Sequence, residues 1–193
     1  MSFGYTVNKE KNGVLLAYLA ERIPNITLRK LLKLVYLTDE KFTIERGFPL
    51  TWFSYFAWKK GPVAPEVYDV KNGSFSEYVQ CHRNNEDKCE VSPVSGILTQ
   101  EKLNLYSLYE MDMIDKIIST YGSMSADELT DITHFDDTLW SKVVNENNLT
   151  FSDSGRSDCE IHLNRLIEGD EEKEEVFEDA LEYMQFCNAT SVC

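Results

Sequence analysis

An aromatic run followed by a rigid corner constrains the fold of this chain more than any other stretch. Residues 52–58 read Trp-Phe-Ser-Tyr-Phe-Ala-Trp, a composition typical of a β-strand. Gly61-Pro62 should end that strand, because proline lacks a backbone N–H and fixes φ near about −65°. Pro65 then suits the first turn of a short helix, which Asn72-Gly73 should end. The sequence therefore predicts a strand that passes into a helix through a rigid corner.

Alternation along the run places aromatic side chains on both faces of the predicted strand. One face would carry Trp52, Ser54, Phe56 and Trp58, and the other Phe53, Tyr55, Ala57 and Lys59. We therefore expect other elements to cover the strand on both sides. Trp58, and the downstream Trp140, should be largely buried.

Apolar periodicity elsewhere predicts a mainly α (α+β) fold, in which helices surround a central helix and one small antiparallel β-sheet. The central helix should begin after Thr27 and end near Gly47, because its apolar stripe is broad enough to be contacted on several sides. Asn8 is a suitable N-cap for a helix before it. Later helices should begin at Thr99, at Ser125, at Asp136 or Asp137, and at Asp170. A left-handed Gly122 should end the long Thr99 helix.

A β-hairpin is predicted between residues 78 and 91, with a polar turn at residues 83–87. A register that pairs Cys81 with Cys89 also pairs Val79 with Val91 and gives one apolar face. We expect this hairpin to join the aromatic strand in the single small sheet.

Charged residues are distributed unevenly along the chain, with most of the net negative charge near its C-terminal end. The net charge is −14, and residues 149–193 alone carry twelve acidic and three basic side chains. We divide the chain into a domain of residues 1–148 and an acidic extension of residues 149–193, whose final helix we expect to pack on the domain. So acidic a protein is unsuited to general nucleic-acid binding, which needs clustered Lys and Arg. Arg29, Lys30 and Lys33 form a local basic cluster, which we interpret as a solvated helix face.

Neither a membrane segment nor a cofactor is indicated. No apolar run approaches 18 residues and residues 1–5 are no basic-then-apolar leader, so we expect a cytoplasmic protein. The cysteine count is odd, which argues against a disulfide framework. The five cysteines are Cys81, Cys89, Cys159, Cys187 and Cys193. Cys159 and His162 have a zinc-ligand spacing that Cys81, His82 and Cys89 would complete, but only one such tight pair exists, and we predict no metal.

His134 is the strongest candidate for chemistry, because it lies at a predicted helix end among acidic residues that should raise its pKa. It would form an acid–base pair with Asp136 or Asp137, or assist Cys89 as a nucleophile. No nucleophile-bearing motif supports either role. A structural histidine that packs on Trp140 is the alternative.

Three stretches in order resemble a known family. Residues 57–68, Ala-Trp-Lys-Lys-Gly-Pro-Val-Ala-Pro-Glu-Val-Tyr, resemble the signature of the Panacea domain, a bacterial and phage family that includes SocA-like antitoxins and GepA-like phage-associated proteins. Residues 28–36 are similar to its upstream leucine-rich helix, and residues 129–134 with Trp140 to its downstream Thr-His…Trp element. The resemblance covers roughly residues 8–147.

This resemblance implies an antitoxin-like protein-interaction module that binds and neutralises a partner toxin and acts as an adaptor to a cytoplasmic protease. Aromatic and cationic side chains at the predicted corner would anchor such a partner. Lys59 would hold a carboxylate or a phosphate there, unless it only extends to solvent. The candidate binding residues are Trp58, Lys59, Gly61, Pro62, Tyr68, His134 and Trp140. The alternatives are an enzyme centred on His134 and Lys59, and a phage-encoded factor that binds a host protein.

Overall fold

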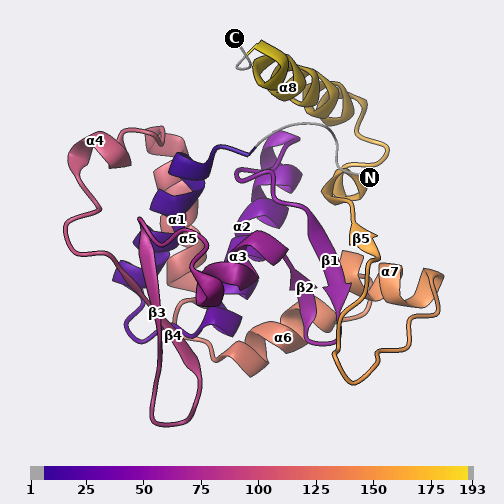
Figure 1. Cartoon of the computed structure of the whole chain (residues 1–193). Coiled ribbons are helices and arrows are strands. Elements are labelled where there is room, and N and C mark those ends of the chain that lie inside the picture. The colour runs from indigo at the N-terminus through magenta and orange to yellow at the C-terminus, as the bar shows by residue number, and fades with distance from the viewer. Residues whose placement is uncertain (1–6, 191–193) are drawn as a thin grey trace.

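The computed structural model describes residues 7–190, so Cys193 and the first residues of the chain lie outside the described part. Helices dominate that part and accompany two small antiparallel sheets (Figure 1). The predicted mainly α fold is confirmed, with two sheets in place of one. None of the described helices is long and apolar enough to cross a membrane.

The central helix is α2 (Leu28–Arg46), and α1 (Lys9–Arg22) precedes it. Both predicted N-caps are confirmed: the side chain of Asn8 accepts from the Lys11 N–H at 2.9 Å, and that of Thr27 accepts from Lys30. Gly47 ends α2 with φ of 86°. Helix α2 contacts α1, α5, α6 and strand β2, which explains its broad apolar stripe (Figure 1).

The predicted corner is instead a tight β-hairpin. Strand β1 (Tyr55–Trp58) is shorter than expected, and β2 (Gly61–Val63) pairs back on it, with Trp58 opposite Gly61. Gly61 allows this reversal because its φ is +102°, which other residues rarely adopt. Pro62 is tolerated because β2 is an edge strand of the sheet β2-β1-β5. Only one face of β1 is fully buried; the face with Trp58 is half-buried.

After β2 the chain forms α3 (Pro65–Tyr68), which has proline in its first turn as predicted, and a 3-10 helix η1 (Asp69–Asn72). The second sheet is the hairpin of β3 (Val79–Arg83) and β4 (Cys89–Pro93), separate from β1.

The predicted register of this hairpin is wrong by two residues, because Cys81 pairs with Val91 and Arg83 with Cys89. Asn84 explains the shift: its side-chain oxygen accepts from the backbone of Glu86 and Lys88 and so closes the turn at residues 84–88. The structure joins Cys81 and Cys89 by a disulfide, with Cα atoms 5.9 Å apart, where the sequence indicated free thiols.

The long helix expected from Thr99 is two helices, α4 (Gln100–Leu103) and α5 (Leu108–Tyr121). Ser107 and Glu110 form a capping box that starts α5 anew. Gly122 follows α5 with φ of −65°, so the expected left-handed stop is wrong. Ser125 caps α6 (Ala126–His134) as predicted, whereas Thr138, rather than an aspartate, caps α7 (Leu139–Glu146).

The acidic extension supplies β5 (Glu160–Ile161), a 3-10 helix η2 (Leu163–Leu166) and α8 (Glu171–Thr190). Strand β5 pairs with β1 at Tyr55 and Phe56. Helix α8 contacts the preceding chain through Phe177, whose ring lies 5.4 Å from that of Trp52, measured between centroids. The division of the chain between residues 148 and 149 stays a prediction.

Candidate functional site

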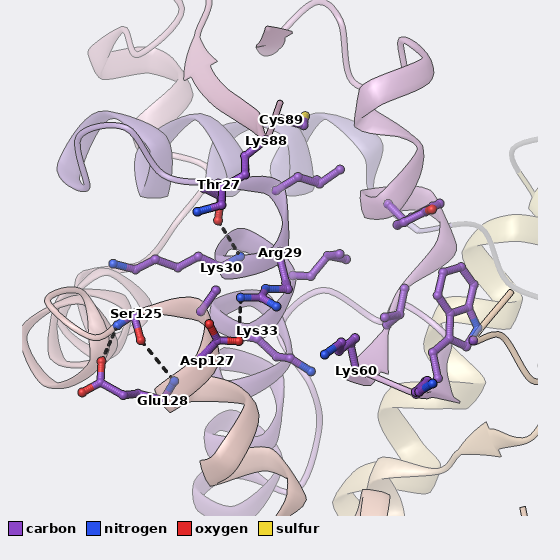
Figure 2. Close-up of a pocket in the computed structure, with 18 of the residues that line it drawn as sticks. Thr27, Arg29, Lys30, Lys33, Lys60, Lys88, Cys89, Ser125, Asp127 and Glu128 are labelled. Carbon is purple, nitrogen blue, oxygen red and sulfur yellow. Dashed lines mark hydrogen bonds and ion pairs between the residues drawn. The ribbon is translucent and has the colours of Figure 1, made fainter. Parts of the chain in front are cut away.

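A cleft of about 960 Å³ lies between α2, the β1–β2 turn, the start of α6 and the loop at residues 153–155. Figure 2 shows its basic side chains extending from different elements. The basic residues that line it are Arg29, Lys30, Lys33, Lys59, Lys60 and Lys88. Its acidic residues are Asp127, Glu128 and Asp153. The cleft is therefore positively charged in a protein whose net charge is −14.

Two of the acidic residues are already engaged. Asp127 forms an ion pair with Arg29 at 2.8 Å, and Glu128 accepts from the backbone N–H of Ser125 at 2.7 Å (Figure 2). Within residues 7–190, no acidic side chain forms an ion pair with Lys33, Lys59 or Lys60. The exposed Lys59 and Lys60 are therefore available to an anionic partner, whereas the Nζ of Lys33 is unpaired but buried.

Lys33 is buried, with 1% of its surface exposed, so the interpretation of the basic cluster as a solvated face is wrong at this position. Its Nζ has no hydrogen-bond partner among the described residues. Burial and then the positive charge of Arg29 lower the pKa of Lys33 to about 7. Lys30, by contrast, donates to the Gly122 carbonyl at 2.6 Å. Lys33 is therefore an unusual feature of the cleft wall.

Gly61 brings Lys33 together with two polar groups of α6. A Cβ atom at position 61 would overlap the Nζ of Lys33 and lie 3.0 Å from both the Nε2 of His134 and the Oγ1 of Thr133. The Nε2 of His134 is also buried without a partner in the described part of the chain. Thr133 donates its hydroxyl to the Thr130 carbonyl at 3.0 Å. Three polar side chains thus converge where only glycine fits.

The expected rise in the pKa of His134 is wrong. Burial and then the nearby charge of Lys33 lower this pKa to about 4, with Lys60 acting in the same direction and Asp131 opposing. Asp136 and Asp137, which the sequence analysis invoked, are exposed beyond the end of α6. His134 is therefore neutral near pH 7.

His134 stacks on Trp140, with ring centroids 3.6 Å apart and planes 5° from parallel. The Nε1 of Trp140 donates to the carbonyl of Trp58 at 2.9 Å, which ties α7 to β1. Both tryptophans are partly buried and pack against the hydrophobic core. The stack holds His134 beside the Gly61 turn.

The cationic rim of the cleft combines predicted and unexpected residues. Trp58 and Tyr68 pack edge to face at 4.9 Å, and the guanidinium of Arg156 lies 4.9 Å from the Trp58 ring centroid. Lys71 lies over the Tyr68 ring at 3.7 Å, and its hydrogen bonding, ahead of that of Arg156, lowers the pKa of Tyr68. Lys59 is exposed, and its backbone N–H donates to the Gly155 carbonyl at 2.8 Å.

The candidate binding residues thus lie in one region. Trp58, Lys59 and Tyr68 line the cleft, Gly61 lies against Lys33, and the stack of His134 and Trp140 adjoins Gly61. Pro62 is buried in β2 and does not line the cleft.

Sequence reasoning missed Lys33, Lys60, Thr133 and Arg156 as site residues. A signal existed for Lys33, which stands between two leucines on a helix contacted from several sides. No sequence signal placed Arg156 against Trp58.

Neither catalytic alternative gains support from this geometry. Cys89 is joined to Cys81, so it offers no thiol to His134. Lys59 lies on the rim, whereas the Nε2 of His134 is directed at Gly61 and Lys33. In residues 7–190, no three His, Cys, Asp or Glu side chains gather as a metal site would require.

The sequence model of the family described as "Antitoxin SocA-like, Panacea domain" matches residues 31–141, more than half of the chain. The chain belongs to this family. The match includes Lys33, Trp58 to Tyr68, and Thr133 to Trp140, while Arg29 and Arg156 lie outside it. Much of the cleft lining is therefore built within the family region, whereas its residues between 25 and 30 and between 153 and 155 lie outside it.

A curated relative, "Antitoxin SocA" of Caulobacter vibrioides (strain NA1000 / CB15N), is 28% identical over 126 residues. The alignment covers 64% of this chain and 61% of the relative's own length. No solved structure matches this chain.

Proposed function

We propose that this protein is an antitoxin-type module that neutralises a partner protein by holding an acidic segment of it in the cleft. The observation that carries the proposal is the positive, partly apolar cleft of an acidic protein, which the family-like stretches 28–36 and 57–68 line, with the third stretch next to them at Gly61. Family membership and the curated relative's name support the antitoxin role.

The lining of the cleft suits protein binding. Leu28, Leu32 and Val63 supply apolar wall, and Trp58 and Tyr68 offer aromatic anchors beside the free cations. Interfaces concentrate their binding energy in such aromatic and cationic residues. Complementary charge would also raise the association rate with an acidic segment. A binding module of this kind needs no catalytic group.

Transfer of the neutralised partner to a cytoplasmic protease, which the family resemblance implies, is part of the same proposal. A second protein would need a surface separate from the cleft. Helix α8 offers one, because Tyr183 is 68% exposed and Phe186 is 64% exposed on it.

The test is co-expression with the toxic product of a neighbouring gene. Wild type should restore growth and co-purify with that product, whereas Lys59→Glu should rescue growth poorly at an unchanged melting temperature. Lys9→Glu is the matched control, because Lys9 is also exposed but lies on α1, outside the cleft lining. Full rescue by Lys59→Glu would count against the cleft.

A further inference from the structure

We propose that Lys33, which lines the cleft and has Thr133 and His134 next to it at Gly61, forms with them a socket that binds the carboxylate of an acidic side chain of the partner. This inference rests on the proposed function and names the chemical group that the cleft recognises. Lys33 would donate to the carboxylate once its Nζ, which is buried against Gly61 in the free protein, turns toward the cleft that its side chain lines.

The socket differs from other buried polar groups of the described residues in its lack of hydrogen-bond partners. The only buried side-chain nitrogen or oxygen atoms without a hydrogen-bond partner in residues 7–190 are the Nζ of Lys33 and the Nε2 of His134, and both approach Gly61. The equally buried Asp39 is fully engaged: it accepts from the Thr51 backbone at 2.8 Å and from the Tyr55 hydroxyl at 2.7 Å. Burying an ammonium group without a partner is costly, so a ligand that supplies an anion relieves that cost.

The surroundings favour a singly charged carboxylate over a phosphate. Asp127 and Glu128 occupy the first turn of α6 and line the cleft, where they offset part of its positive charge. Arg29, the side chain best suited to bidentate phosphate binding, is already paired with Asp127. Leu32 and Val63 would contact the apolar stem of a glutamate or aspartate.

Binding of this kind requires a proton. Lys33 faces Arg29 on its own helix and His134 on α6, while Lys60 on the β1–β2 turn and Asp131 on α6 act on His134. Because the pKa of Lys33 is about 7 in the free protein, a carboxylate that pairs with the ammonium group should raise it. Affinity for the acidic partner should then fall about tenfold for each pH unit above 7 until the raised pKa is reached.

The experiment measures the pKa of Lys33 by the NMR shift of its carbon-13-labelled Cε, with probes compared at equal ionic strength. The probes are sodium chloride, sodium acetate, sodium phosphate, a capped Leu-Leu-Glu-Leu-Leu peptide and its Gln counterpart. We expect the Glu peptide to raise the pKa by about one unit or more, and the Gln peptide and chloride to leave it unchanged. Lys33→Met identifies the resonance, and Lys41→Met, on the exposed side of α2, should leave peptide binding unchanged.

The following outcomes would overturn the inference, whereas a pKa raised by both the Glu peptide and acetate would agree with it. A pKa that no probe raises means that there is no anion socket. A response to acetate without the Glu peptide indicates a small-molecule site, and a response to phosphate alone indicates a different ligand class. The NMR titrations do not use the partner protein, so they test the socket separately from the co-expression assay. If Lys59→Glu loses rescue but no probe raises the pKa of Lys33, the proposed binding cleft is retained and the socket is rejected. A shift at Lys33 with full rescue in Lys59→Glu would reject the proposed function and the inference with it.

Discussion

Replacing Lys33 by methionine should stabilise the free protein. The pKa of Lys33 falls from 10.5 to about 7 on folding, mainly through burial. At about 1.4 kcal/mol per pKa unit, holding this lysine in the folded state costs up to roughly 4 kcal/mol at neutral pH. Methionine has a similar length, carries no charge and fills irregular apolar space well. We therefore expect Lys33→Met to gain at least roughly 2 kcal/mol of unfolding free energy.

The pH dependence of the gain follows from proton binding. Between about pH 7 and pH 10.5 the unfolded chain holds the Lys33 proton more tightly than the folded chain, so the wild type becomes more stable as pH rises. The advantage of Lys33→Met should accordingly be greatest at or below about pH 7 and should vanish near pH 10.5.

Urea denaturation followed by circular dichroism, on both proteins across this pH range, measures the effect. Lys41→Met is the control, since Lys41 lies on the same helix in an exposed ion pair with Glu45 and should change stability by less than about 0.5 kcal/mol. A less stable Lys33→Met protein, or a gain that does not depend on pH, would refute the reasoning.

Three further predictions concern the framework. Trp140→Ala should cost roughly 2–3 kcal/mol, because it removes the His134 stack and the hydrogen bond to Trp58; an unchanged urea midpoint would contradict this. Gly61→Ala should lower the unfolding free energy by more than roughly 2 kcal/mol, because the added Cβ would overlap the Nζ of Lys33. Gly96 is also at positive φ but has open space around it, so Gly96→Ala should lower the unfolding free energy by only about 1 kcal/mol. Equal losses in the two variants would show that the overlap with Lys33 is relieved easily. Deleting residues 170–193 should lower the melting temperature, because Phe177 then no longer covers Trp52 and Ile167, and an unchanged melt would show that α8 adds no stability.

The helical part of the fold could be predicted because its signals are local. Asn8, Thr27 and Ser125 each cap a helix with their own side chain, and the breadth of the α2 stripe indicated its central place. The sheets could not be predicted in the same way, because pairing depends on distant partners. The two residues that pair with β1 from the acidic extension, Glu160 and Ile161, carry no local sign of that contact.

The general position of the candidate site could be predicted from the sequence, but the burial of Lys33 could not. The corner around Trp58 and the pair of His134 and Trp140 were identified from family-like stretches, and the structure brings them together. Charge patterning on the helix predicts a solvent-facing Lys33, but the side chain is buried because the Gly61 hairpin folds over it. The same error gave the wrong direction for the pKa of His134, since sequence neighbours suggested acids where the fold supplies cations.

The most direct test of the partner-binding cleft is the dissociation constant of the complex with the purified neighbouring-gene product, measured by calorimetry. Lys60→Glu should weaken binding by about tenfold or more with an unchanged melting temperature, because it replaces an unpaired cation in the cleft lining by an anion. Lys9→Glu makes the same change of charge outside the cleft and should bind as wild type does. Equal affinities for wild type, Lys60→Glu and Lys9→Glu would contradict the account and place the interface elsewhere on the protein.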